Sequence, residues 1–322
     1  MLLKLIPDNT SFGFTRIRFA ALAFSAVLVV GSLIALATLG LNFGVDFKGG
    51  VTVEVSDTKP IDIGAVRSAV SDLGLGSVDV QEIQDFAGSD KAVLIKVSQQ
   101  EVENPDATDA EGENIQFQAL NQVKETVSAL LGEGATFRKE DVVGPTVSGE
   151  LVQKGALAVA LAIGMMLIYI WLRFEWQFSL GAIIALVHDV IITLGMFSVT
   201  RLEFNLSIIA AILTIVGYSM NDTVVVYDRV RENLRKFKTK PLADLIDLSI
   251  NDTLTRTIMT SGTTMLALMA LVIFGGAVLR GFTLAMIWGI VIGTYSSIFV
   301  ASPFLLATDV KRDWSKAVPA GA

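Results

Sequence analysis

Long apolar runs dominate the pattern along the chain, and six of them are long enough to cross a hydrocarbon core, which takes about 20 residues. They predict membrane-spanning helices at residues 19–39, 155–172, 178–200, 206–227, 257–278 and 282–307. The first run is longer than the apolar part of a cleaved signal peptide, about 7–15 residues, so we interpret it as an uncleaved anchor. A composition of 52% hydrophobic and 18% charged residues is typical of a membrane protein.

The segment 41–150 has a different pattern, with apolar residues alternating at strand spacing or recurring at helical spacing. It predicts strands at 51–55, 78–84, 91–97 and 135–143, with a turn at 88–90, and helices from Pro60 and over 115–131. The order βαββαβ predicts a ferredoxin-like α+β domain. That fold carries many functions, so it does not indicate one.

Lysine and arginine are distributed unevenly over the segments that flank the spans. If the N-terminus is inside, the inner segments hold Lys4, Arg16, Arg18, Arg173, the seven basic residues of 229–256, Lys311, Arg312 and Lys316, and the outer ones only Lys154, Arg201 and Arg280. The positive-inside rule therefore predicts cytoplasmic termini and an extracytoplasmic ferredoxin-like domain. That domain carries a net charge of −12 and the remainder +5. We interpret this as membrane topology, with no footprint of nucleic-acid binding.

These patterns divide the chain into four parts: residues 1–40 with the first span, the domain 41–150, a five-helix bundle 151–308, and a cytoplasmic tail 309–322. The bundle contains a cytoplasmic loop, 228–255, in which the fourth helix continues past the interface. An amphipathic helix then restarts at Pro241, either lying at the inner surface or capping the bundle. We interpret the acidic run 101–113 as a solvated loop rather than a partner site.

Glycines mark both junctions of the domain with the bundle, at Gly44, Gly49, Gly50, Gly144 and Gly149. Glycine permits backbone conformations that other residues avoid. These positions could be tight turns at a membrane exit or a pair of hinges, and the residue types alone favour turns.

Asp222 lies in the fourth apolar run, where an ionised carboxylate costs about 2.5–3.5 kcal/mol at a helix centre. It lies about 24 Å along the helix from Leu206, at about 1.5 Å per residue. Arg256 at the start of the fifth span is expected at a similar level, so an Asp222–Arg256 ion pair is geometrically accessible. The pair could fasten two helices, or it could open and close as the carboxylate gains and loses a proton. Neighbouring Asn221, with Ser219 and Thr223, can hydrogen-bond either state.

His188 and Asp189 form a second polar site, near the middle of the third span. His188 is the only histidine of the chain, and histidine is the residue type best suited to carry protons near neutral pH. Packing of polar groups against neighbouring helices explains the two residues equally well. Gly289 and Gly293 form a small-xxx-small pattern that predicts close helix packing.

No nucleotide-binding loop, metalloprotease motif or catalytic triad is present, and the chain has no cysteine. We therefore expect a protein that is not an enzyme and that needs no cofactor or metal.

Six segments together carry a resemblance to a known family: "GVDFKGG", "VVGPTVSGEL", "ALVHDVIITLG", "GYSMNDTVVVYDRVREN", "TLTRTIMTSGTT" and "GTYSSIFVASP". In this order they resemble the SecD/SecF family of bacterial protein-export membrane proteins, on its SecF side. The family is related to resistance-nodulation-division (RND) transporters, in which two six-helix halves form one unit.

The resemblance implies partners, a location and an energy source. The partners would be a SecD subunit, the Sec translocon channel, unfolded preproteins and lipids of the bacterial inner membrane. The energy for preprotein translocation and release would be the proton-motive force. The family's intramembrane Asp and Arg fall on Asp222 and Arg256, and this favours proton coupling, with Asn221, His188 and Asp189 as further candidates.

Two other functions stay open: half of a small-molecule or lipid exporter of the RND type, and a passive scaffold for translocon assembly. An exporter needs an apolar pocket in the extracytoplasmic domain, and a scaffold does not need Asp222 to titrate. The sequence leaves open whether protons or Na⁺ are coupled.

Overall fold

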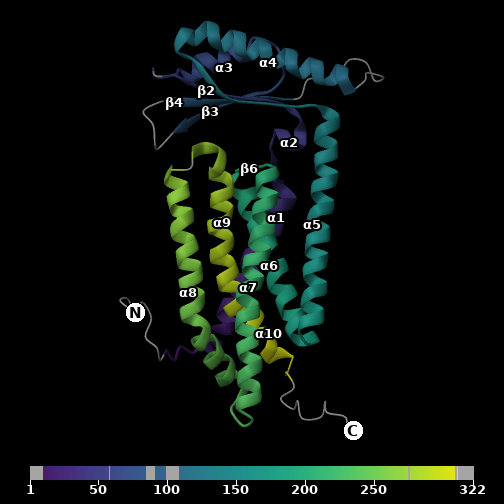
Figure 1. Ribbon diagram of the computed structural model, residues 1–322, viewed down its shortest axis with the longest axis vertical. Helices are drawn as coiled ribbons and strands as arrows, with labels where there is room; N and C mark the ends of the chain where they lie inside the picture. The colour runs from purple at the N-terminus through teal and green to yellow at the C-terminus, as the bar shows by residue number, and fades with distance from the viewer. Residues whose placement is uncertain are drawn as a thin grey trace.

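The computed structural model describes residues 10–57, 59–84, 91–98, 109–274, 276–308 and 310, and it shows a helical bundle with a small sheet domain across one end (Figure 1). Within these residues, six helical stretches are long and apolar enough to cross a membrane. They lie at the predicted places: Phe14–Thr38, Val147–Arg173, Trp176–Thr200, Leu206–Lys236, Leu242–Phe274 and Leu279–Ala307. This confirms the predicted class, a six-helix membrane protein with one α+β domain.

The bundle consists of α1 (Arg18–Thr38), α5 (Pro145–Arg173), α6 (Trp176–Thr200), α7 (Leu206–Lys236), α8 (Leu242–Phe274) and α9 (Gly276–Ser296). A short 3₁₀ turn, Phe14–Ile17, precedes α1. The last span is irregular: α9 passes into a π-helical turn, Ser297–Ala301, and then into α10 (Ser302–Ala307). As predicted, α7 continues well past the apolar run.

One prediction about the bundle is wrong. Residues 242–256 do not form a separate amphipathic helix, because α8 runs unbroken for 33 residues into the fifth span. No glycine or proline occurs between Pro241 and Gly262, so the sequence offers nothing that would end the helix. The first turns of α8 bury Leu245, Ile246 and Ile250 in the core of the bundle.

The sheet domain, residues 50–143, has the predicted order of elements: β2 (Gly50–Asp57), α3 (Ile63–Ser71), β3 (Val78–Gln84), β4 (Lys91–Ser98), α4 (Asp109–Leu131) and β5 (Thr136–Val143). The strands pair in the order β3-β4-β2-β5, and all pairs are antiparallel. This is the ferredoxin-like arrangement. The acidic run is helical from Asp109 onward, so the loop interpretation fails there. The rest of the run and the predicted turn at 88–90 lie outside the described residues.

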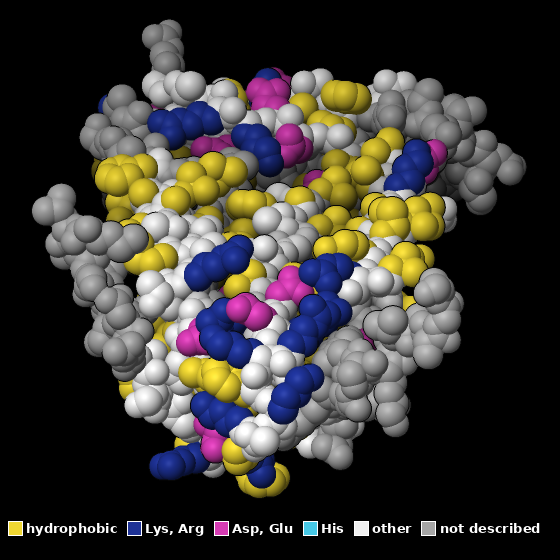
Figure 2. Space-filling model, turned by 60° about the horizontal axis from the view of Figure 1, so that its bottom comes forward, with side chains coloured by type: hydrophobic (Ala, Val, Ile, Leu, Met, Phe, Trp, Pro, Cys, Tyr) yellow, Lys and Arg dark blue, Asp and Glu magenta, His cyan; other side chains and the backbone are white. Residues whose placement is uncertain are grey.

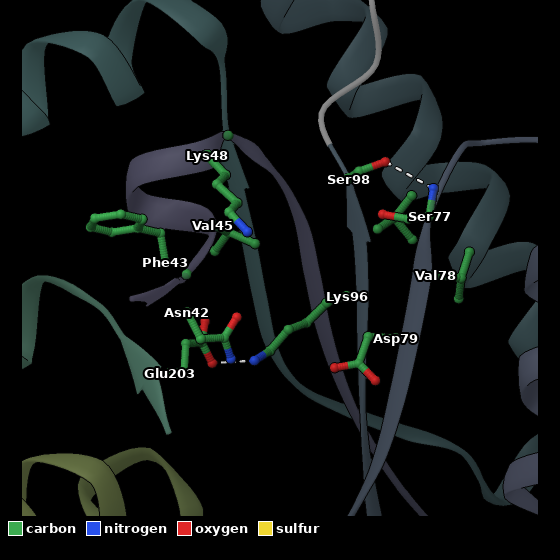
Figure 3. Close-up of a pocket in the computed structure, with 13 residues that line it drawn as sticks. Asn42, Phe43, Val45, Lys48, Ser77, Val78, Asp79, Lys96, Ser98 and Glu203 are labelled. Atoms are coloured by element: carbon green, nitrogen blue, oxygen red, sulfur yellow. Dashed lines mark hydrogen bonds and ion pairs between the residues drawn. The ribbon is translucent and has the colours of Figure 1, made fainter. Parts of the chain in front are cut away.

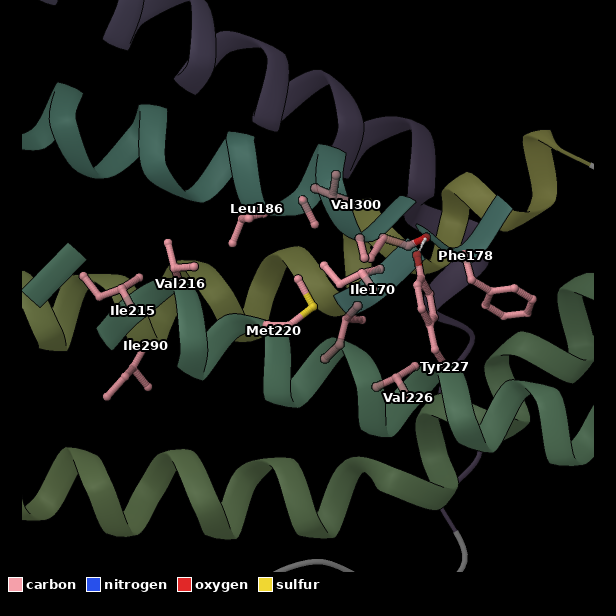
Figure 4. Packing of buried hydrophobic residues seen from close by; sticks show 14 of the residues in the cluster. Ile170, Phe178, Leu186, Ile215, Val216, Met220, Val226, Tyr227, Ile290 and Val300 are labelled. Carbon is pink, nitrogen blue, oxygen red and sulfur yellow. Dashed lines mark hydrogen bonds between the residues drawn. The ribbon is translucent and has the colours of Figure 1, made fainter. Parts of the chain in front are cut away.

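Each part has its own hydrophobic core. In the sheet domain, valines of β2 pack with α3 and α4, and in the bundle the core lies between α6, α7 and the last span (Figure 4). The pattern at Gly289 and Gly293 has the predicted packing role. A Cβ on Gly289 would collide with Ile215, and one on Gly293 would lie 2.9 Å from the Cβ of Ser219. These two glycines let α9 approach α7 closely.

Two short elements join the sheet domain to the bundle. After α1 the chain forms β1 (Asn42–Phe43), which pairs in parallel with β6 (Glu203–Phe204) in the loop between α6 and α7. A single turn of helix, α2 (Val45–Lys48), then leads into β2. On the other side, β5 leads directly into α5.

Candidate functional site

Asp222 is buried at the point where α7, α8 and the last span meet, with 8% of its surface exposed. One carboxylate oxygen accepts a hydrogen bond of 2.6 Å from the hydroxyl of Thr257 on α8. The other accepts from the hydroxyl of Ser297, the first residue of the π-helical turn. The carboxylate on α7 is therefore bound by side chains from two other helices.

Asp189 on α6 is more deeply buried, with 1% of its surface exposed, and it has three partners. One of its oxygens accepts from Ser219 on α7 at 2.5 Å and from Ser296 on α9 at 2.7 Å. The other lies 2.9 Å from Nδ1 of His188. The His188 ring stacks on Tyr295 with ring centroids 6.2 Å apart, and its buried Nε2 has no hydrogen-bond partner. His188 and Asp189, although adjacent on the helix, thus contact each other directly.

Two consecutive serines bring the carboxylates into one polar layer. Ser296 donates to Asp189, and Ser297 donates to Asp222. The π-helical turn begins at Ser297, and the hydroxyl of Ser302 donates to the Ser297 carbonyl at 2.7 Å. π-helical turns inside α-helices occur frequently at functional sites. Here the turn places two adjacent residues against two different helices.

Arg256 lies at the level of Asp222, as expected, since the neighbouring Thr257 donates to that carboxylate. Its own side chain is exposed on the outside of α8, and no ion pair between it and Asp222 is present. Both residues belong to the described part of the chain, so the expected pair is not formed in this conformation. Asn221 is also exposed, on the outside of α7. Of the five candidate residues, Asp222, His188 and Asp189 face the bundle interior, whereas Arg256 and Asn221 face outward.

The network can hold either charge state of its carboxylates. A hydroxyl donates to a carboxylate and can instead accept from a carboxylic acid by rotating about one bond. Hydroxyl partners therefore allow a proton to arrive or leave without a change of backbone. An ion pair with arginine stabilises only the charged form, because a guanidinium has no acceptor.

The five candidate hinge glycines fall into different environments. Gly49 and Gly50 have φ angles of 73° and 124°, a region that other residues rarely adopt. Gly44 is tightly packed, because an added Cβ would collide with the side chain of Glu203. Gly144 precedes the first residue of α5, and Gly149 lies inside that helix with open space beside it.

Ser296, Ser297 and Thr257 were missed as candidate residues by sequence reasoning. The only available signal was the pair of adjacent serines in an otherwise apolar span. Hydroxyl residues are frequent in membrane helices because their side chains can bond to the backbone of the preceding turn. Thr263 and Thr264, which donate to backbone carbonyls on α8, show that this signal is not specific.

Comparison with known families gives two matches. A family model described as "Protein export membrane protein SecD/SecF, C-terminal" matches residues 122–311, and one described as "SecD/SecF GG Motif" matches residues 34–56. Proteins named protein translocase subunit SecF, from Rhodobacter capsulatus and Cereibacter sphaeroides, are 45% and 44% identical to the chain. These alignments cover 98% of this chain and 95% and 94% of the relatives.

Solved structures of SecDF are also similar. The crystal structure of SecDF from Thermus thermophilus, a translocon-associated membrane protein, matches 95% of this chain with a TM-score of 0.79 and 32% identity. This chain spans only 40% of that longer chain. SecDF in a super-membrane-facing form matches with a TM-score of 0.63 at 33% identity. At equal coverage, this chain superposes more closely on the first of these structures than on the second.

Proposed function

The chain belongs to the SecD/SecF family of protein-export membrane proteins, and from that premise we propose that it couples a transmembrane proton gradient to preprotein translocation. In this proposal it is a subunit without enzymatic activity or cofactor. It acts beside the Sec translocon channel and promotes the movement and release of unfolded preproteins on the outer side.

The observation that carries the proposal is the hydrogen bonding of Asp222. The buried carboxylate is held by the hydroxyls of Thr257 and Ser297, while Arg256, next to Thr257, is left unpaired. Hydroxyl partners can hold the protonated form of Asp222, and we assign this conformation to that form. When the proton leaves, the charged carboxylate attracts the guanidinium, and α7 and α8 shift relative to each other. Proton uptake and release thereby alternate two packings of the bundle.

We assign His188 and Asp189 to the same process. Asp189 is joined through Ser296 to the serine that binds Asp222, and His188 contacts Asp189 directly. A histidine is suited to pass protons near neutral pH. The pair would extend the proton route from Asp222 toward α1. The ring of His188 stacks on that of Tyr295, and the Tyr295 hydroxyl donates a hydrogen bond to the Ala21 carbonyl on α1.

A SecD subunit is the proposed partner in the membrane. The outer surfaces of α7 and α8 carry exposed Thr214, Asn221, Arg256, Thr260 and Thr263. Polar side chains in membrane helices usually face a protein interior or a water-filled cavity, because contact with lipid is costly. A second six-helix half packed against α7 and α8 would cover them, and the longer SecDF chain has length for such a half.

The proposed orientation places the sheet domain outside an inner membrane, with both termini in the cytoplasm. Lysine and arginine gather on the end of the bundle away from the sheet domain (Figure 2). That end includes a hollow lined by Arg173, Asp228, Arg231, Glu232, Arg235 and Lys236. Basic clusters at this level favour the cytoplasmic side and attract anionic lipid headgroups.

The test is preprotein secretion by inverted membrane vesicles, with native protein, Asp222→Asn, and Asp228→Asn as the matched control. Asp228 is also on α7, but it is exposed and paired with Arg173. We expect the proton gradient to accelerate secretion in native and Asp228→Asn vesicles but not in Asp222→Asn vesicles. A gradient effect that survives Asp222→Asn contradicts the proposal. Acceleration that resists a protonophore and vanishes with a sodium ionophore would assign the coupling to Na⁺.

A further inference from the structure

The motif "GVDFKGG" is in close contact with the helix that carries Asp222, and this contact suggests a role for it. We call residues 42–48, which comprise β1, Gly44 and α2, the linking turn. It lies between the end of α1 and the start of β2 (Figure 1), and β2 is the second strand from one edge of the sheet. Its partners are residues 203–206, where α7 begins.

Backbone contacts fasten the linking turn to this segment. Asn42 and Phe43 pair with Glu203 and Phe204, and the Gly44 N–H donates to the Phe204 carbonyl at 2.9 Å. A Cβ added at Gly44 would collide with the carboxylate of Glu203, so that side chain would have to move to make room for it. Gly44 is therefore a point of close contact between the linking turn and Glu203.

A side chain of the linking turn caps α7 directly. The Asp46 carboxylate accepts a hydrogen bond of 2.9 Å from the N–H of Leu206, the first residue of α7. The helix also has its own cap, Asn205, which accepts from Ile208. The first N–H groups of a helix have no partner within it, and a carboxylate there also interacts favourably with the helix dipole. Asp46 thus binds the N-terminus of α7 from a separate segment of the chain.

Aromatic packing strengthens the same contact. The ring of Phe204 lies 5.8 Å from that of Phe43 and 5.9 Å from that of Phe47, measured between centroids. Phe197 of α6 contacts Phe204 at 5.9 Å as well. The linking turn and the start of α7 therefore form one packed unit, so that they are expected to move together.

Beyond this unit the chain can change direction. Gly49 separates α2 from β2, and Gly50 is the first residue of β2; both have positive φ. A cavity of about 460 Å³ lies between the linking turn and strands β3 and β4, bridged by the ion pair of Lys96 with Glu203 (Figure 3). The sheet therefore has a connection through glycine, which permits a wide range of backbone angles, and space beside it.

We propose that Asp46 is the positioning residue that transmits displacement of α7 to the sheet domain. When α7 shifts, Leu206 carries Asp46 and the linking turn with it, and the sheet tilts at Gly49, directly before β2. This inference rests on the proposed function, because it needs the charge of Asp222 to displace α7. It adds that the outer domain is driven through one hydrogen bond and the packing around it.

The test measures two distances by paired spin labels on introduced cysteines, in the full chain with its SecD partner in lipid nanodiscs. The native sequence has no cysteine that would interfere. Exposed Leu172 on α5 and exposed Lys238, two residues past the end of α7, report on the inner end of α7. Exposed Asp72 and Val199 report on the sheet domain. Each distance is compared between Asp222 and Asp222→Asn, which mimics the protonated carboxylate.

Four variants isolate the hydrogen bond. Asp46→Ala removes the acceptor, and Leu206→Pro removes the N–H donor at the first helical position, where proline is tolerated. Asp46→Asn keeps an acceptor. Asp62→Ala is the matched control, because Asp62 caps α3 within the sheet domain by accepting from Gly64 and Ala65. Leu206→Pro provides the test if Asp46→Ala does not fold.

We expect Asp222→Asn to change both distances in the native, Asp46→Asn and Asp62→Ala backgrounds. In Asp46→Ala and Leu206→Pro the bundle distance should still change, and the change at the sheet domain should be lost. A sheet-domain change that persists in both variants overturns the inference and leaves the proposed function intact. If Asp222→Asn changes neither distance in the native background, the proposed function fails and the inference with it.

Discussion

Removing the hydroxyl of Ser297 should stall proton coupling, because this group stabilises only one of the two proposed states. In the structure it donates to Asp222, while Arg256 is unpaired. Asp222 is proposed to be neutral in that state, and a hydrogen bond between neutral groups contributes about 0.5–1.5 kcal/mol. Ser297→Ala should therefore shift the equilibrium toward the Arg256-bound state by about 2- to 10-fold, since about 1.4 kcal/mol corresponds to a factor of ten.

This shift is comparable with the energy that drives the cycle. One charge crossing the full membrane potential yields about 2.3 kcal/mol per 100 mV. A variant biased by about 0.5–1.5 kcal/mol would use a large part of that energy to return to the hydroxyl-bound state. Gradient-dependent secretion should then fall about 2- to 10-fold, while the rate without a gradient stays at the native level.

The assay is secretion by inverted vesicles as the gradient is titrated with a protonophore. Ser198→Ala is the control, because Ser198 is equally buried but its hydroxyl donates to the backbone carbonyls of Ala35 and Gly40, away from both carboxylates. We expect Ser198→Ala to keep the native dependence on the gradient. The reasoning is refuted if Ser297→Ala follows the native titration curve.

Three further predictions concern packing and assembly. Gly289→Ala should destabilise the bundle by about 1–3 kcal/mol, because the added Cβ meets Ile215. The measurement is the thermal unfolding midpoint in detergent, and the control Gly164→Ala, which has open space beside it, should not lower that midpoint. Gly50→Ala should cost about 1–3 kcal/mol, because its φ of 124° is strained for alanine, and unfolding in denaturant measures this directly. Purification in mild detergent should recover a SecD subunit with the chain; recovery of a monomer or homodimer alone would contradict the proposed assembly.

The sequence was sufficient for most of the fold, since apolar run length determines membrane spans and residue periodicity determines the ferredoxin-like order. The sequence was less informative about where a helix begins and ends when that helix runs from a polar into an apolar region. The loop prediction for 228–255 relied on polarity, but α8 continues because Leu245, Ile246 and Ile250 have a buried surface to pack against. Polarity indicates solvent exposure of part of a helix rather than the end of the helix.

The candidate site was only partly predictable. Asp222, Asp189 and His188 stand out because charged groups are rare in apolar spans. Their partners do not, because the bonds of Ser219, Ser296 and Ser297 depend on how closely α9 approaches α7. Gly289 and Gly293 set that approach, and the π-helical turn sets the direction of the serines. Such contacts follow from tertiary packing, which residue types alone do not specify.

The most direct test of the account compares four proteins in gradient-driven secretion: native, Asp222→Asn, Arg256→Met and the double variant. We expect all three variants to lose the gradient-dependent part of secretion, although each variant should accumulate in the membrane in the same amount as the native protein. If the pair only fastened α7 to α8, removing both charges together would be mild, since an uncharged pair avoids the cost of burying charge. Normal gradient-dependent secretion by the double variant would therefore contradict the central claim.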